Sequence, residues 1–431
     1  MPLLLSYYGD DFTGSTDVME ALASHGVKTV LFTRQPSPGE FRPFTDYQAV
    51  GLAGTSRSQP PQWMETNLRP AFAWLKGLGA EFCHYKVCST FDSSPLTGSI
   101  GKAIDIGAEV FAQGIVPLVV GAPQLNRYTA FGNLFAAYQG RIYRIDRHPV
   151  MRRHPVTPMT EADLTLHLGQ QTARPVTCIS PGLAPDSAEL GGGGIVLIDV
   201  LDHATQAAAG RLLLQSRARI GPFVAGSSGV EYALLAALRE QGRIAGTEAF
   251  PPPGAVDRIA VVSGSCSPTT GRQIRFALDQ GFAGLPLDPL ALAQGQGVIE
   301  AAAKGVELLK SGRSVIAYTA LGGATDRSAE LADDAAARHM IGTSLGRILK
   351  AMVEQGALSR AVIAGGDTSS HAMAELGILA LTTRFPLEAT PGSPLCATHG
   401  FRHGFEIAMK GGQVGGDGYF VQMRDGYQRR L

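Results

Sequence analysis

Two adjacent carboxylates stand in the segment YYGDDFTGS (residues 7–15), after an apolar run and before a stretch of helical composition. Neighbouring acids repel each other unless a positive group or hydrogen-bond donors lie opposite them. At a turn from strand to helix, Asp10 and Asp11 therefore indicate a polar ligand or a metal. A solvated turn in which Asp11 or Thr13 caps the helix explains this segment equally well.

Polar side chains also follow other apolar runs in the first half of the chain. The segments GTSRS (residues 54–58) and KVCSTFDSS (residues 86–94) contribute the candidate binding residues Arg57, Lys86, Ser89, Thr90 and Asp92. A guanidinium and an ammonium group can hold a carboxylate, while aspartates accept hydrogen bonds from several hydroxyl groups. Together these groups predict a hydroxy acid as the ligand. Each residue taken singly is explained as well by an exposed turn charge or a local turn hydrogen bond.

Glycine-containing turns follow two apolar runs in the second half. SGSCS (residues 263–267) precedes Pro268, which suits the first position of a helix, and GGDTS (residues 365–369) precedes another helical stretch. Glycine lets the backbone approach a ligand closely, and the N–H groups at a helix start attract phosphate oxygens. We predict that these turns cradle the phosphates of a nucleotide. The segment MKGGQVGGDGYF (residues 409–420) could cover that nucleotide or form a flexible hairpin.

The composition limits the classes of function. The chain has 431 residues, more than one ordinary core supports, and we predict two domains. Charged residues make up 17% of the chain and balance at a formal net charge of +0, so neither nucleic acid nor a membrane surface is predicted as a partner. A small molecule fits better. The five cysteines are odd in number and scattered, which argues against a disulfide framework.

Several familiar patterns are absent. The N-terminal segment has too short an apolar run for a signal peptide, and no stretch approaches the roughly 18 apolar residues of a membrane-spanning helix, so we expect a soluble, cytoplasmic protein. TGSIGKA (residues 97–103) lacks the spacing of a P-loop, and without a G-x-G-x-x-G fingerprint a dehydrogenase is disfavoured. His148 and His154 each precede a proline in an extended segment, where structural histidines are expected rather than a metal pair.

Apolar runs alternate with turns and helical stretches, a pattern typical of α/β architecture. The predicted strands cover residues 3–8, 47–53, 83–87, 115–120, 176–179, 195–200, 222–225, 259–262, 314–318 and 361–364. The predicted helices cover residues 15–24, 99–106, 230–240, 269–279 and 370–376. Fully apolar strands suit parallel sheets that are covered on both faces. Three prolines and a glycine at residues 251–254 predict the interdomain linker.

Motifs spread over nearly the whole chain resemble, in order, those of the four-carbon acid sugar kinase family. Members of that family phosphorylate threonate, erythronate and their oxo relatives with ATP. The resemblance is carried by GDDFTGSTD (9–17), KVCSTFDSSP (86–95), RHPVTPMTEADL (153–164), AGSSG (225–229), SGSCSPTT (263–270), GGDTS (365–369) and PGSP (391–394). STFDS, HPVTPMT and GGDTS together make coincidence implausible.

The resemblance implies two α/β domains, each with a mostly parallel sheet flanked by helices, and an active site in the cleft between them. It implies an acid-sugar-binding domain over residues 1–250 and an ATP-binding domain over residues 255–431. Contacts to the acid would come from Asp10, Asp11, Arg57, Lys86 and Asp92. Contacts to ATP would come from Ser265, Gly365, Gly366, Asp367, Thr368 and Gly412.

Phosphoryl transfer to an alcohol needs an in-line hydroxyl group, neutralised phosphate charge and a carboxylate that receives the proton. We expect the two glycine-containing turns to hold the triphosphate, Mg²⁺ to bridge its oxygens, and Arg57 and Lys86 to fix the carboxylate of the acid. Asp10 or Asp11 would orient or deprotonate a terminal hydroxyl group, and the sequence does not choose between them. The protein ligands of the metal stay open.

Departures from the family pattern leave the identity of the acid open. Gly9 and Ser15 flank the two acids where many relatives carry alanine, and AGSS (residues 225–228) stands where they carry GGSG. We expect threonate, erythronate or 3-oxo-tetronate as acceptor, with a branched acid such as 3-oxo-isoapionate as the alternative. A non-catalytic sugar-acid-binding protein is the alternative of another class. The oligomeric state is open, a homo-oligomer included.

Overall fold

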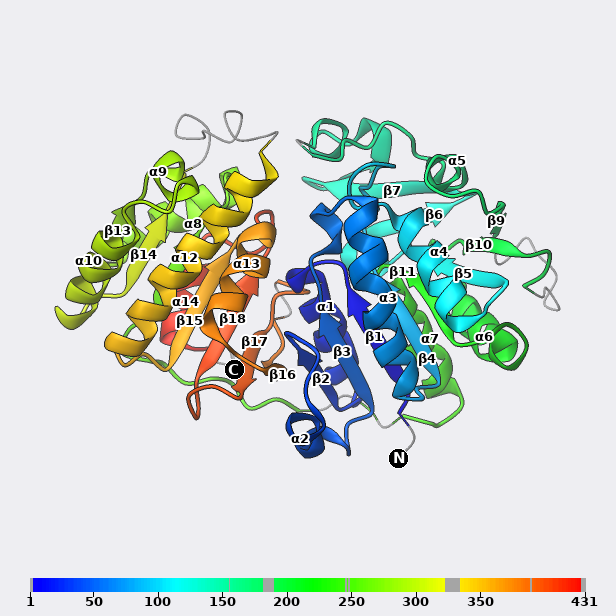
Figure 1. Cartoon of the computed structure of the whole chain (residues 1–431), viewed down its shortest axis with the longest axis horizontal. Helices are drawn as coiled ribbons and strands as arrows, with labels where there is room; N and C mark the ends of the chain where they lie inside the picture. Colours follow the sequence, from blue (N-terminus) through cyan, green and yellow to red (C-terminus); the bar gives the residue numbers. More distant parts are fainter. Residues whose placement is uncertain are drawn as a thin grey trace. The chain divides into compact units, whose positions relative to one another are not determined.

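The computed structural model describes residues 3–154, 156–180, 190–244, 246, 249–321, 334–387 and 390–427. Contacts divide the chain into two compact units. Unit 1 comprises residues 1–30 and 35–248, and unit 2 comprises Leu31–Arg34 and Ala249–Leu431. Each unit contains a sheet with helices on both faces (Figure 1), which confirms the predicted α/β fold class.

The main sheet of unit 1 is parallel throughout, in the order β3-β1-β4-β11-β5-β10-β9. Its strands are β1 (Leu5–Gly9), β3 (Ala49–Ala53), β4 (Phe82–Lys86), β5 (Ile115–Val119), β9 (Val176–Ile179), β10 (Gly194–Ile198) and β11 (Phe223–Gly226). All of them were predicted, with ends that differ by no more than two residues. Because the strands are parallel, the turns after them lie along one edge of the sheet, where ligands of open α/β sheets bind.

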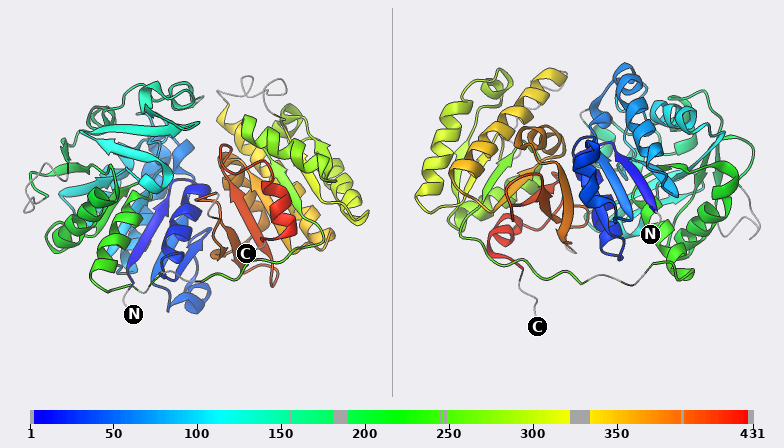
Figure 2. Two further views of the ribbon diagram at one scale, coloured as in Figure 1. Left: turned by 180° about the vertical axis from the view of Figure 1, so that it is seen from behind. Right: turned by 60° about the horizontal axis from the view of Figure 1, so that its bottom comes forward.

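Helices cover both faces of this sheet. They are α1 (Phe12–Ala23), α3 (Pro61–Gly77), α4 (Ile100–Phe111), α6 (His203–Ile220) and α7 (Gly229–Glu240). Helices α3 and α4 pack together on one face (Figure 1), and α6 and α7 pack together on the other, as the view from behind shows (Figure 2). Shorter helical segments include α2 (Pro38–Phe41), η2 (Ser56–Ser58), η5 (Met151–Arg153) and α5 (Leu164–Gly169).

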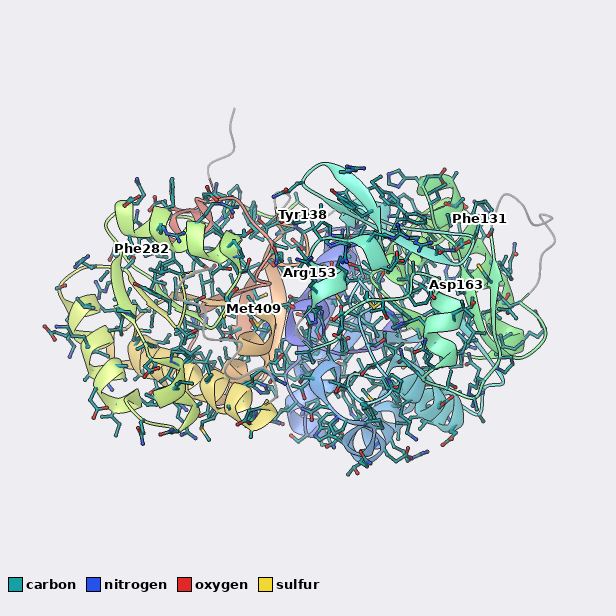
Figure 3. The ribbon with its side chains drawn as sticks, turned by 90° about the horizontal axis from the view of Figure 1, so that it is seen from above. Phe131, Tyr138, Arg153, Asp163, Phe282 and Met409 are labelled. Atoms are coloured by element: carbon teal, nitrogen blue, oxygen red, sulfur yellow. The ribbon has the colours of Figure 1, made fainter. Side chains whose placement is uncertain are left out.

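A small antiparallel sheet that was not predicted follows β5. It consists of β6 (Arg127–Ala130), β7 (Asn133–Tyr138) and β8 (Arg141–Arg144). Tyr138 ends β7, and Phe131 lies in the turn between β6 and β7 (Figure 3). Strands β6 and β8 contain polar residues and are partly or mostly exposed, so they lack the apolar runs from which the other strands were predicted, and the apolar run within β7 was not assigned to a strand.

The sheet of unit 2 is mixed, in the order β13-β14-β12-β15-β18-β17-β16. Its strands are β12 (Ala260–Ser263), β13 (Ala283–Pro286), β14 (Val315–Tyr318), β15 (Arg360–Ala364), β16 (Ala380–Phe385), β17 (Leu395–His399) and β18 (Glu406–Lys410). The first five strands in this order, β13, β14, β12, β15 and β18, are parallel to one another. Strand β17 runs antiparallel to both of its neighbours, β18 and β16. Within this unit, Leu31 and Phe32 of β2 (Thr29–Phe32) pair antiparallel with β16.

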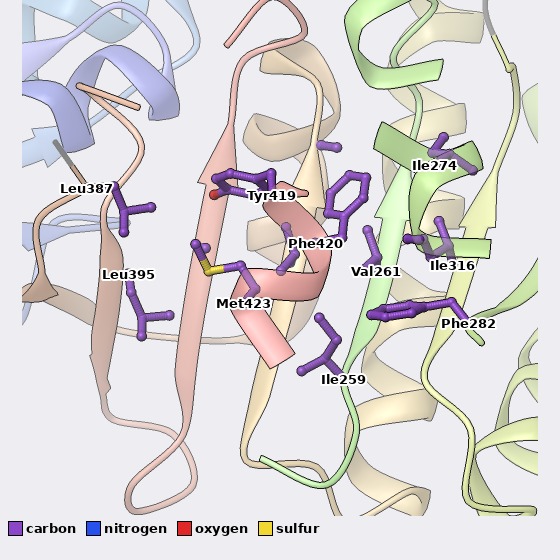
Figure 4. Close-up of a cluster of buried hydrophobic side chains, with 14 residues drawn as sticks. Ile259, Val261, Ile274, Phe282, Ile316, Leu387, Leu395, Tyr419, Phe420 and Met423 are labelled. Atoms are coloured by element: carbon purple, nitrogen blue, oxygen red, sulfur yellow. The ribbon is translucent and has the colours of Figure 1, made fainter. Parts of the chain in front are cut away.

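The helices of unit 2 are α8 (Pro268–Asp279), α9 (Pro289–Ala293), α10 (Val298–Lys310), α12 (Ala335–Gln355), α13 (Gly366–Leu376) and α14 (Tyr419–Asp425). A buried apolar cluster forms between the sheet and the helices α8 and α14 (Figure 4). In it, Tyr419, Phe420 and Met423 of α14 face the strands that carry Val261 and Ile316. This packing fixes α14 over the sheet, and with it the glycine-rich segment that leads into this helix.

Two helix starts differ from the prediction. Helix α1 begins at Phe12 and α13 begins at Gly366, each several residues earlier than expected. Most of the predicted turn residues therefore belong to first helical turns, whose backbone N–H groups have no intrahelical acceptors. Glycines 411, 412, 415, 416 and 418 join β18 to α14, so the alternative of a hairpin is wrong.

Close packing between α6 and α7 gives a prediction for stability. A Cβ atom at Gly210 would lie 1.9 Å from the backbone oxygen of Ala233. We expect Gly210→Ala to lower the free energy of unfolding by about 2 kcal/mol or more, because the helices would have to move apart. Urea denaturation of the full chain measures this. Gly77→Ala in α3 is the matched control, since no heavy atom lies within 4 Å of its Cβ position; equal losses in both variants would contradict the packing argument.

Candidate active site

The predicted acid-binding residues of unit 1 lie at the carboxyl edge of its sheet. Asp10 and Asp11 follow β1, Arg57 lies in η2 after β3, and Lys86 ends β4. The Asp10 N–H donates to the Lys86 carbonyl oxygen at 2.9 Å, and the Arg57 N–H donates to the Asp10 carbonyl oxygen at 3.1 Å. Backbone bonds therefore hold these turns side by side beyond the end of the sheet.

The guanidinium group of Arg57 joins two of the predicted carboxylates. Its Nη1 lies 2.9 Å from Asp11 Oδ2, and its Nη2 lies 3.0 and 3.1 Å from the two oxygens of Asp92. Burial acts to lower the pKa of Arg57. The nearby side chains of Asp92, Cys88 and Asp11 have the larger, opposite effect and raise this pKa well above its ordinary value. Arg57 therefore remains a cation, and these carboxylates occupy both terminal nitrogens.

Asp92 is the best-satisfied acid of the cluster. Besides Arg57, it accepts hydrogen bonds from Thr90 Oγ1 at 2.5 Å and from Thr157 Oγ1 at 2.9 Å. Burial opposes its ionisation, but Arg57, His154 and Thr90 together lower the pKa of Asp92 to about 2. Asp92 is thus ionised at neutral pH and fixes the loop after β4. Ser89 lies in the same loop, half-buried.

A second ion pair of this cluster joins Lys86 to Asp17. Lys86 Nζ is 3.4 Å from Asp17 Oδ2 of α1, and Ser228 Oγ donates to the same carboxylate oxygen. Burial raises the pKa of Asp17. Burial acts to lower the pKa of Lys86, but the carboxylates of Asp17 and Asp10 outweigh this effect, so the pKa of Lys86 is raised. Gly14 makes room here, because a Cβ atom on it would lie 2.8 Å from Asp11 Oδ1 and 3.2 Å from Lys86 Nζ.

Asp10 and Asp11 have different environments. Asp11 caps α1, since its Oδ1 accepts from the N–H of Gly14 and from Thr13 Oγ1. Asp10 is also buried, but its Oδ1 has no hydrogen-bond partner among the described residues. Burial and the adjacent Asp11 raise the pKa of Asp10 to about 7, against the lowering effect of Arg57 and Lys86. Asp10 is therefore the member of this pair that is suited to exchange a proton near neutral pH.

Several residues of this cluster were not predicted from the sequence. Asp17 and Ser228 belong to the segments that carry the family resemblance, but they lie in or beside helices and were not singled out. His154 was predicted to be structural; its Nδ1 accepts from the Thr157 N–H at 3.1 Å, and the Thr157 hydroxyl group in turn donates to Asp92. His148 is structural, since its Nδ1 accepts from two backbone N–H groups.

In unit 2, the two predicted phosphate-binding turns meet at the carboxyl ends of β12 and β15, which pair in register. A Cβ atom on Gly365, whose φ is +119°, would lie 2.9 Å from Thr368 Oγ1 and 3.4 Å from the Ser265 nitrogen. One on Gly412 would lie 2.8 Å from Ser265 Oγ. Ser265, Gly365, Thr368 and Gly412 are thus brought together, with Gly366 and the Asp367 backbone in the first turn of α13. The side chain of Asp367 lies outside the described part.

Lys410 adds a buried amino group that the sequence analysis did not single out. It ends β18, and its carbonyl oxygen accepts from the Gly365 N–H at 2.9 Å. Its Nζ donates to Thr270 Oγ1 at 3.0 Å, and it makes no ion pair with the residues that the structure describes. Burial lowers the pKa of Lys410 to about 7. A phosphate nearby would favour its protonated form.

Two features are absent from the described part of the chain. No group of three or more His, Cys, Asp or Glu side chains within it could hold a metal ion. No helix within it is long and apolar enough to cross a membrane.

Comparisons with known proteins match both units. A family of sugar-binding N-terminal domains matches residues 5–234, and a family of nucleotide-binding C-terminal domains matches residues 260–420. A 3-oxo-isoapionate kinase of Paraburkholderia graminis is 44% identical over 98% of this chain and 94% of its own. A 3-oxo-tetronate kinase of Methylobacterium radiotolerans is 32% identical over 99% of both chains. A crystal structure from Salmonella typhimurium LT2 has the same fold, with a TM-score of 0.74, 24% identity and coverage of 97% of this chain and 98% of its own.

The conformation of Gly365 gives a prediction for nucleotide binding. Its φ of +119° is unfavourable for alanine, and the added Cβ atom would press on Thr368. We expect Gly365→Ala to raise the Kd of a non-hydrolysable ATP analogue by about tenfold or more while acid binding stays unchanged, as measured by calorimetry. Gly377→Ala is the matched control, because Gly377 ends the same helix with φ +71° and nothing within 4 Å. Weaker nucleotide binding in both variants would point to a general loss of helix stability instead.

Proposed function

The chain belongs to the four-carbon acid sugar kinase family and is a sugar-acid kinase, and we propose that its acceptor is the branched acid 3-oxo-isoapionate. The observation that carries this choice of acid is the 44% identity to a 3-oxo-isoapionate kinase, against 32% to a 3-oxo-tetronate kinase. The linear acid 3-oxo-tetronate is the second candidate. Of the two acids, the branched one was the alternative in the sequence analysis.

We propose that unit 1 binds the acid and that Asp10 is the base. A carboxylate that removes a proton from a hydroxyl group works best with a pKa near the working pH, and the pKa of Asp10 is about 7. The unpartnered Oδ1 of Asp10 leaves an acceptor for a substrate hydroxyl group. Asp11, already engaged by the helix start and by Arg57, would position that arginine and its partner Asp92.

We propose that unit 2 binds the phosphates of ATP. The N–H groups at the starts of α8 and α13 and the Lys410 amino group supply the positive potential that phosphates need. Mg²⁺ would add charge neutralisation at the phosphate oxygens. Since the described residues contain no cluster of metal ligands, the phosphates themselves would be its main ligands. The expectation that the reaction takes place in a cleft between the domains stays a prediction.

A panel of acids tests the acceptor. ADP release would be measured with ATP and Mg²⁺ against 3-oxo-isoapionate, 3-oxo-tetronate, and the D and L forms of threonate and erythronate. We expect the highest kcat/KM with 3-oxo-isoapionate. A preference for 3-oxo-tetronate would select the linear acid, and no turnover with any acid, despite nucleotide binding, would overturn the acceptor class.

The pKa of Asp10 predicts how activity depends on pH. Below about pH 7, Asp10 takes up a proton and can no longer accept one from the substrate, so kcat/KM should fall about tenfold per pH unit. Asp10→Asn should lower kcat by about a thousandfold and remove this fall of kcat/KM at low pH, the acidic limb of the pH profile. Initial rates over pH 5 to 9 measure both effects.

Asp11→Asn is the matched control for this assignment. Asparagine keeps an oxygen acceptor for the start of α1 but loses the charge opposite Arg57. We expect a smaller loss in kcat, about tenfold to a hundredfold, with the acidic limb retained. If Asp11→Asn loses the limb and Asp10→Asn keeps it, the roles of the two aspartates are exchanged.

A further inference from the structure

The two cations predicted to hold the substrate carboxylate are already paired with protein carboxylates. Both terminal nitrogens of Arg57 contact Asp11 and Asp92, and Lys86 lies against Asp17. A substrate carboxylate would have to displace one of these buried partners, which would leave a protein carboxylate desolvated without a counter-charge. Another cation is therefore better suited to bind the substrate carboxylate.

Arg127 is such a cation. Its Nη1 donates to the backbone carbonyl oxygens of Leu125 and Asn126, at 3.1 Å each. Within the described part of the chain, its buried Nε has no hydrogen-bond partner and the side chain forms no ion pair. Burial without a counter-ion lowers the pKa of this guanidinium, although it remains a cation at neutral pH. An unpartnered donor on a desolvated cation is a feature that an anionic ligand would satisfy.

The backbone places Arg127 at the edge of the sheet that carries the acidic cluster. Arg127 begins β6 and pairs back onto Ala122, just beyond the carboxyl end of β5. The thiol of Cys88 lies within electrostatic range of Arg57, Lys86 and Arg127. Cys88 Sγ is also 3.0 Å from Thr90 Oγ1, which donates to Asp92. Arg127 thus lies near the cluster without being part of its ion pairs.

The charges of the cluster favour the same assignment. Among the described residues, four carboxylates, from Asp10, Asp11, Asp17 and Asp92, face the cations of Arg57 and Lys86, and His154 acts on Asp92 as well. A further anion would be repelled there unless another positive charge received it. We propose, on the basis of the proposed function, that Arg127 binds the carboxylate of the sugar acid and so selects acids over neutral sugars. Arg57 then acts as a positioning residue that holds Asp11 and Asp92.

The test compares Arg127→Met with Arg141→Met in the full chain. Arg141 lies in β8 of the same small sheet and is exposed, so its replacement should leave catalysis and acid binding unchanged. We expect Arg127→Met to raise the Kd of the acid, measured by calorimetry without nucleotide, and its KM by about 50-fold. The KM for ATP should not change. Arg127→Lys, which keeps the charge but not the planar fork, should give an intermediate loss.

A neutral analogue separates carboxylate recognition from a structural role. It is the polyol in which a hydroxymethyl group replaces the carboxylate of the acid that the wild-type protein turns over best. The wild-type protein should have a higher kcat/KM with the acid than with the polyol. Arg127→Met should lose that preference because its kcat/KM falls with the acid and stays unchanged with the polyol. Added guanidinium ion should restore part of the acid turnover of an Arg127→Ala variant.

The outcomes distinguish this inference from the proposed function. If the wild-type protein turns over no acid of the panel, the proposed function fails first. If it turns over an acid and Arg127→Met keeps the same KM, Kd and preference over the polyol, the assignment of Arg127 is overturned and Arg57 or Lys86 is the anchor. Equal losses with the acid and the polyol would also overturn it, because they indicate a structural role.

Discussion

The pairing of Arg57 with Asp11 and Asp92 holds the acidic edge of unit 1 together. Each of these residues comes from a turn after a different strand, and burial would otherwise force the carboxylates to take up protons. One planar guanidinium group pairs with both and fixes their separation, which a lysine could not do with the same geometry. The neighbouring turn of Asp10 is held to Arg57 through its backbone. Asp17 is held separately, by Lys86 and Ser228.

The same cluster gives two aspartates opposite properties. Arg57, His154 and Thr90 hold the pKa of Asp92 at about 2, whereas burial and the adjacent Asp11 raise that of Asp10 to about 7. Ionised Asp92 therefore stabilises the fold above the unfolded pKa of an aspartate, and this contribution is lost as the pH falls through about 2. Ionisation of Asp10 has the opposite effect on stability. Because its pKa is raised in the folded protein, the free energy of unfolding falls as the pH rises from about 4 to 7. Such a division is typical of a site in which one acid gives structure and another exchanges protons.

The sequence predicted the parts of the fold that depend on local pattern. Buried parallel strands such as β5 and β15 are continuous apolar runs, and the turns after them carry the polar residues, so both could be read from composition. The strands β6 to β8 could not, because β6 and β8 contain polar residues and depend on pairing partners, and a short apolar run such as that of β7 does not by itself identify a strand. The unpaired state of Arg127 and the burial of Lys410 are also tertiary properties: an isolated arginine or lysine in a sequence gives no sign of whether a carboxylate will reach it. Predicted contacts such as Arg57 with a substrate carboxylate thus stay predictions.

The pairing of Leu31 and Phe32 with β16 has a consequence for how the chain reaches its folded state. Four residues made early in synthesis complete the sheet edge of a unit whose other residues all follow position 248. Unit 2 therefore cannot finish its sheet as a simple C-terminal module. A fragment cut at residue 249 would expose the backbone donors and acceptors of β16, an edge that invites pairing with other chains. During translation, the first unit must keep this short segment available until the last third of the protein has emerged.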